Sequence, residues 1–223
     1  MEKTFVVNQS FDGFNEEISK YIYSLFVSIS NVASNYIHYD GNSTKEDYEH
    51  VERVFAYELY HQWSESSLIK SNKSLIVNAE IPKILISDAR SANIPLMYPD
   101  LVLHQGQNDY KGNIIICEIK RASYARQYPE KVLEDFKKLA IYLSEDLKIK
   151  ANKKDWDPFE VGVFVMTDSP DSVMPLSTGS IMSCIENWLK EIKGIDNKVQ
   201  KKIICVVYNG NELKYETLYN LIN

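Results

Sequence analysis

The chain has 223 residues, with 25 Lys and Arg against 31 Asp and Glu, so its formal net charge is −6. This length suits one domain with a sizeable core, and a composition that is 44% hydrophobic and 12% aromatic excludes a disordered chain. The acidic balance argues against a general nucleic-acid coat protein, because lysine and arginine carry phosphate binding.

Membrane and disulfide signals are weak. No apolar run reaches the ~18 residues that span a bilayer, and the start MEKTFVVNQS lacks the apolar centre of a signal peptide. We therefore expect a cytoplasmic protein with no membrane contact. Cys117, Cys184 and Cys205 are widely spaced, lack a CxxC pair and have apolar neighbours, so they are predicted to be buried free thiols and not zinc ligands.

The first two predicted elements are helices. Residues 14–37 repeat apolar side chains at helical intervals and carry acids in the first turn, where the helix dipole favours them. Residues 45–66 follow a turn-rich link in which Thr44 and Asp47 resemble a helix-start box. We expect a single domain that consists of an N-terminal helical extension at 1–45 and a core at 46–223.

Glu58 has an ambiguous place on the second helix. It lies beside the apolar stripe that includes Val51 and Phe55. From position alone, its carboxylate either points into the fold or reaches water at the edge of the stripe.

Three strands are predicted next. Residues 74–81 are apolar and β-branched and end before Pro82. Residues 100–104 and 113–120 form a hairpin around a polar turn whose Gly, Asn and Asp residues supply turn chemistry.

The rest of the chain alternates helices and strands. Pro129 starts a helix at 129–149, and helical periodicity returns at 180–193. Apolar runs predict strands at 159–167 and 201–209, while 212–222 fits either an edge strand or a short helix. The order predicts an α/β fold with a mixed β-sheet flanked by α-helices.

The hairpin carries charges that a buried strand normally excludes. Side chains alternate across a strand, so Glu118 and Lys120 project from the same face. If His104 pairs with Ile114, antiparallel register places Asp100 opposite Glu118, with Cβ atoms within about 5.5 Å. A slip of one residue would move Asp100 to the other face. We expect His104 to be a hydrogen-bonded structural residue and not a ligand.

Two carboxylates so close together indicate a cation site. They repel each other in a dry environment unless a cation lies between them. Oxygen ligands with few histidines favour Mg²⁺, or Mn²⁺, over zinc. Lys120 beside the ion could orient an attacking water or stabilise charge on a phosphate, which suits hydrolysis of a phosphodiester. The alternative is a structural Asp–Glu–Lys ion-pair cluster.

The pairs Pro99-Asp100 and Glu118-Ile119-Lys120 resemble the motifs of the PD-(D/E)XK nuclease superfamily, which has the restriction-endonuclease-like fold. The order of elements from about residue 46 to 147 is similar as well. The resemblance implies that Asp100 and Glu118 bind the divalent metal and that Lys120 takes part in catalysis.

The resemblance also implies a glutamate on the early helix. Glu58 would be this residue, as an outer metal ligand or a partner of a metal-bound water, with Glu52 and Glu80 as weaker candidates.

Further groups are predicted to bind substrate. Lys137 and Lys138 lie on the helix after the second hairpin strand, where the superfamily often brings a basic group towards the phosphate. Arg121 and Arg126 belong to the same basic stretch, and Tyr124 is a candidate for base stacking. The alternative for both lysines is a solvated helix face.

These residues predict a Mg²⁺-dependent nuclease, a hydrolase that acts on DNA in preference to RNA. The alternatives are a non-catalytic nucleic-acid-binding or assembly protein on the same fold, and a nuclease that is active only within a complex. A homodimer would explain how both strands of a duplex are cut.

Overall fold

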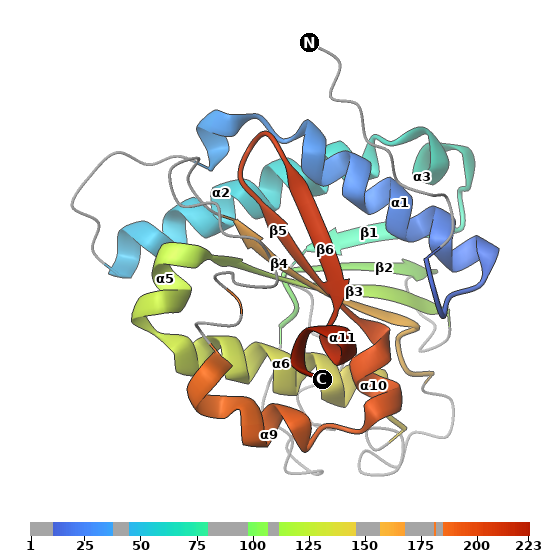
Figure 1. Ribbon diagram of the computed structural model, residues 1–223. Helices are drawn as coiled ribbons and strands as arrows, with labels where there is room; N and C mark the ends of the chain where they lie inside the picture. The colour runs from blue at the N-terminus through green and yellow to red at the C-terminus, as the bar shows by residue number, and fades with distance from the viewer. Residues whose placement is uncertain are drawn as a thin grey trace, which may run out of the picture.

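The structure is a computed structural model that describes residues 11–37, 45–79, 98–106, 112–145, 157–167, 181 and 185–223 (Figure 1). Most of the polar turn between the hairpin strands lies outside the described residues. So do Glu80, Cys184 and the last residues of the helix predicted to end at 149.

One six-stranded mixed sheet forms the centre of the molecule, with its strands in sequence order. The first three strands pair antiparallel, the third to the fifth pair parallel, and the sixth pairs antiparallel with the fifth. The strands are β1 (Leu75–Ala79), β2 (Leu101–Gln105), β3 (Asn113–Arg121), β4 (Val161–Thr167), β5 (Ile203–Tyr208) and β6 (Leu213–Thr217). The predicted mixed sheet flanked by helices is confirmed.

Two long helices cover one face of the sheet, α1 (Glu16–Asn31) and α2 (Lys45–Ser64) (Figure 1). Asn15 caps α1 by accepting the N–H of Ile18 at 2.9 Å, and acids occupy its first turn, as the dipole favours. The short η1 (Ser34–Tyr36) and α3 (Ser67–Ser71) follow these helices. Residues of α1 and α2 share one apolar core with the sheet, so the predicted extension contributes to the same core as residues 46–223.

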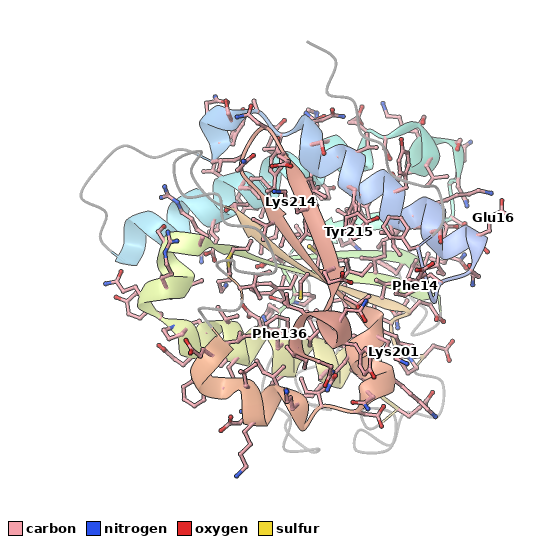
Figure 2. All side chains as sticks on the ribbon, viewed as in Figure 1. Phe14, Glu16, Phe136, Lys201, Lys214 and Tyr215 are labelled. Carbon is pink, nitrogen blue, oxygen red and sulfur yellow. The ribbon has the colours of Figure 1, made fainter. Side chains whose placement is uncertain are left out.

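Shorter helices and α6 (Pro129–Leu143) cover the other face (Figure 1). Pro129 occupies the first turn of α6, where its missing N–H costs nothing. Phe136 of α6, labelled in Figure 2, packs on Phe164 of β4 with ring centroids 4.8 Å apart. The other elements here are α5 (Ala122–Gln127), η4 (Glu186–Trp188), α9 (Leu189–Lys193), α10 (Asn197–Lys202) and α11 (Leu218–Ile222).

Three short helices, α3, α5 and α10, were not predicted. They have five or six residues each, too few for an apolar periodicity to be visible. α5 and α10 also adjoin an apolar strand that dominates the local pattern. Residues 212–222, for which the sequence allowed either an edge strand or a short helix, contain both, because β6 runs directly into α11.

The described cysteines are buried free thiols, Cys117 on β3 and Cys205 on β5, as predicted. Among the described residues, no helix combines the length and the apolar character that a membrane crossing requires.

Candidate active site

The candidate site lies where β3 ends and α5 begins. Ile116 belongs to the apolar core between the sheet and α6, whereas Cys117 and Ile119 belong to the core under α1 and α2. Glu118 and Lys120, two and four residues after Ile116, lie on the same face of β3 as Ile116. The predicted alternation of faces along β3 therefore holds. The Glu118 side chain is 0% exposed.

Asp100 is joined to β3 directly. Its Oδ2 accepts the backbone N–H of Ile119 at 2.6 Å, one residue beyond Glu118. Leu101 pairs with Cys117, and this register, extended by one residue, brings Asp100 beside Glu118. Asp100 precedes β2 and belongs to no strand, unlike the predicted 100–104.

The predicted pairing of His104 with Ile114 is wrong. The register shifts after Leu103, and His104 lies opposite Asn113, because a bulge absorbs one residue near the turn. The shift leaves the Asp100 end of the hairpin unaffected. His104 is buried, and its Nε2 lies 2.7 Å from the Asn78 amide nitrogen, which agrees with the structural role expected for it.

Lys120 is held by two carboxylates from different helices. Its Nζ lies 3.1 Å from Oε1 of Glu52 on α2 and 3.3 Å from Oδ2 of Asp135 on α6. The other oxygen of Glu52 accepts the backbone N–H of Arg121 at 3.0 Å. Glu52 therefore binds both the lysine and the end of β3.

Lys138 makes the matching contact to Glu118. Its Nζ lies 2.7 Å from Glu118 Oε2 and 3.3 Å from Asp135 Oδ1, and it donates to the Tyr98 carbonyl at 3.3 Å. Asp135 thus bridges the two lysines with its two oxygens. The sequence analysis did not single out Asp135, although its place three residues before Lys138 puts the two side chains on one face of α6.

Burial is the largest influence on the pKa of three carboxyl groups here, those of Asp100, Glu118 and Glu52. It raises the pKa of Asp100, and together with the charge of Asp100 it raises the pKa of Glu118 well above its usual range. Burial also raises the pKa of Glu52 to about 7, in spite of the lysine beside it. Burial alone would lower the pKa of Lys120, but Asp135 and Glu52 raise it well above the ordinary value, so this lysine is charged.

These residues form the buried charge cluster, which consists of Glu52, Asp100, Glu118, Lys120, Asp135 and Lys138. When all are ionised, four carboxylates against two ammonium groups leave two negative charges in excess. Oε1 of Glu118 is buried and accepts no hydrogen bond from the described residues. A divalent cation would neutralise the two excess negative charges and would give Oε1 of Glu118 a partner.

The donor chemistry fits Mg²⁺ or Mn²⁺, which prefer oxygen ligands. Within the described part of the chain, no three His, Cys, Asp or Glu side chains are arranged as a set that could hold an ion. Magnesium usually takes one or two carboxylates and keeps its waters, so Asp100 and Glu118 are the residues that would hold it.

Glu58 does not join this cluster. Its Oε1 accepts a hydrogen bond from Gln62 at 2.7 Å, and its Oε2 lies 3.8 Å from His61 Nδ1. Six residues separate it from Glu52, which is a rotation of about 240° around the helix. Glu52, one of the two weaker candidates in the sequence, is the α2 acid that the structure brings to Lys120. Glu52 has the same three- and seven-residue spacing from apolar residues of the helix as Glu58, so this signal could not choose between them.

The other predicted substrate-binding residues are spread around the cluster. Lys137 is exposed on α6 and Arg126 is exposed on α5. The Arg121 side chain is buried, and its backbone holds Glu52. Of these residues, Lys138 is the one that the structure brings to Glu118.

A pocket of about 370 Å³ opens over the cluster. Glu52, Asp100, Lys120 and Asp135 line its charged side. Further lining comes from two cations and two tyrosines, Arg53 and Tyr57 on α2, Tyr124 on α5 and Lys131 on α6.

Comparisons of the chain with protein family models, curated proteins and solved structures find no match.

Proposed function

We propose that this protein is a Mg²⁺- or Mn²⁺-dependent phosphodiester hydrolase, a DNA nuclease of the PD-(D/E)XK type with a restriction-endonuclease-like fold. The observation that carries the proposal is the buried charge cluster, in which Asp100 lies beside Glu118 where β2 pairs with β3 and Lys120 lines the same pocket as Asp100. Buried charges are costly, and a cluster with excess negative charge suits a cation-binding site.

The order and pairing of the elements support the fold. A helix that bears Glu52 precedes three antiparallel strands, β1 to β3, which carry the two motifs, and α6 and the parallel strand β4 follow. This is the order of elements that the motifs led us to expect.

The side chains of the cluster have different roles in the proposed reaction. Asp100 and Glu118 would hold the divalent ion, which when bound would supply an activated water and neutralise charge on the phosphate. Lys120, fixed by Glu52 and Asp135, donates to the oxygen that gains charge as the phosphodiester is attacked. Lys138 holds Glu118 in place from the side of α6.

The test is cleavage of single- and double-stranded DNA with Mg²⁺ or Mn²⁺, compared with EDTA. The expected result is metal-dependent cleavage that Lys120→Ala abolishes and that Lys193→Ala, at an exposed lysine of α9, preserves. Thermal melting of each variant separates loss of chemistry from loss of fold. Unchanged cleavage by a folded Lys120→Ala protein contradicts the assignment.

A second candidate function is a non-catalytic binding or assembly protein. The observation in its favour is that Glu52, Asp135 and Glu118 pair with Lys120 and Lys138, which neutralise part of the cluster's charge. Calorimetric titration with Mn²⁺ distinguishes the two functions, because a scaffold binds no ion at Asp100 and a nuclease loses its binding in Asp100→Asn. A nuclease that acts only within a complex binds the ion but cuts nothing alone.

A further inference from the structure

One exposed row of side chains leads from the pocket along α2. Arg53, Tyr57 and Tyr60 are spaced by four and three residues, which places them on one face of the helix. Arg53 is exposed, and Tyr57 and Tyr60 are 52% and 38% exposed. Because Arg53 and Tyr57 also line the pocket with Asp100, this α2 row begins at the candidate active site and continues outwards.

Exposed rings are concentrated near this site. Of the large hydrophobic side chains that are strongly exposed among the described residues, two lie in the α2 row and a third, Tyr98, lies two residues before Asp100. The fourth, Tyr215, is on β6, three strands away from β3 in the sheet (Figure 2). Clustered exposed apolar surface marks a contact surface.

The charge balance indicates what kind of contact this is. Among the described residues, the cations that line the pocket besides Lys120 are Arg53 and Lys131, and Lys131 lies 2.8 Å from Glu134. Two such cations offer few phosphate contacts. Affinity for a nucleic acid at this site therefore depends more on stacking than on charge.

Stacking on a tyrosine requires an unpaired base. In a duplex both faces of each base are covered by its neighbours, and exposing one costs a few kcal/mol. In a single strand, successive bases can lie on aromatic side chains. The rise from Tyr57 to Tyr60 along α2 is about 4.5 Å, close to the roughly 3.4 Å per nucleotide of a stacked strand.

We propose that the pocket and the α2 row bind single-stranded nucleic acid, with one unpaired base on Tyr57, its neighbour on Tyr60, and the adjoining phosphate in the pocket beside Arg53 and Lys131. This names the substrate class of the proposed nuclease and rests on that function for cleavage, although binding is measured without it.

The experiment is fluorescence anisotropy of the full chain in EDTA, with a labelled oligothymidine and a duplex of equal length as probes. We expect the single strand to bind at least about tenfold more tightly. Tyr57→Ala should weaken its binding about 5- to 150-fold, whereas Tyr57→Phe, which keeps the ring, should bind as the wild type does. The matched control is Tyr215→Ala, which removes an exposed ring far from the pocket and should leave binding unchanged.

Salt dependence supplies a second readout. If only Arg53 and Lys131 neutralise phosphates, the logarithm of the affinity should fall with the logarithm of salt concentration with a slope of about −1.4. Arg53→Ala should reduce the magnitude of this slope by about 0.7. A much steeper slope contradicts the dominance of stacking.

The outcomes separate this inference from the proposed function. Equal or tighter binding of the duplex, or equal effects of Tyr57→Ala and Tyr215→Ala, overturns the inference even if metal-dependent cleavage is observed. Single-strand binding that depends on Tyr57, in a protein that cuts nothing with Mg²⁺ or Mn²⁺, supports the inference and contradicts a nuclease that acts alone.

Discussion

β3 and β5 lie on either side of β4 and run parallel to it, yet of these two strands only β3 carries charged side chains. All six residues of β5 are buried and none is charged. β3 is equally buried as far as Ile119 but carries Glu118, Lys120 and Arg121 at its end. Because the same sheet accepts a fully apolar strand at β5, its architecture does not require the charges of β3.

The ion-pair partners of these charged side chains come from outside the sheet. Glu52 comes from α2, and Asp135 and Lys138 come from α6, so the two helices that enclose the end of β3 supply its partners. β5 needs nothing of the kind. A costly arrangement that packing does not demand is consistent with a role in binding or catalysis.

The largest expected effect is on cleavage. Glu118→Gln keeps the size of the side chain but removes a charge that would hold the metal, and we expect DNA cleavage with Mg²⁺ to fall by about 10³-fold. The matched control is Glu186→Gln, which changes an exposed acid of η4. Similar rates for both variants would mean that the β3 charges have no part in catalysis.

The second effect is on the free energy of unfolding, measured with urea. Lys138→Met alone leaves Glu118 buried without its cation and should cost about 3–5 kcal/mol. The double variant Glu118→Leu with Lys138→Met makes β3 resemble β5, and should be as stable as the wild type or up to about 4 kcal/mol more stable. A double variant less stable than Lys138→Met would show that the ion pair itself stabilises the fold.

The third effect is a dependence of stability on pH. Glu52 has a pKa of about 7 when folded, above the ordinary value of 4.5, so the folded state binds more protons between these values. Stability from this group is therefore fully present below about pH 4.5 and is lost as pH rises towards 7, by roughly 3 kcal/mol at most.

Urea unfolding across this pH range measures the effect, and Glu52→Gln should flatten the profile. If Mg²⁺ binds the cluster, it should stabilise the protein more at pH 8 than at pH 5, because protons compete with the ion. A profile that is unchanged in Glu52→Gln would assign the pH dependence to other groups.

Asp135 should have a smaller effect on the reaction. It bridges Lys120 and Lys138, so Asp135→Asn should lower cleavage about 10- to 100-fold, as expected for a residue that orients catalytic groups. Asp135→Glu should recover part of the loss. A fall in KM without a change in kcat would contradict a role in positioning Lys120.

The smallest effect belongs to β5. Ile204→Val removes one buried methylene group and should cost about 0.5–1.5 kcal/mol in urea unfolding, with no change in Mn²⁺ affinity. Lower Mn²⁺ affinity in this variant would show that β5 also supports the site.

Short-range patterns in the sequence were enough to predict much of this protein. The apolar runs of β3, β4 and β5 and the periodicity of α1, α2 and α6 predict a mixed sheet flanked by helices. Alternation along β3 and the spacing to Asp100 placed Glu118 beside Asp100. Each of these patterns depends on contacts between near neighbours or across one turn.

Other features depend on how distant elements meet, and only the tertiary structure decided them. The choice of Glu52 over Glu58 follows from the rotation of α2 against the sheet, and the bridge at Asp135 requires α6 to pack beside β3. The α2 row becomes a candidate binding surface only because the pocket lies at one end of it. A contact between residues more than sixty positions apart leaves no periodicity in the sequence, because it is set by the packing of whole elements.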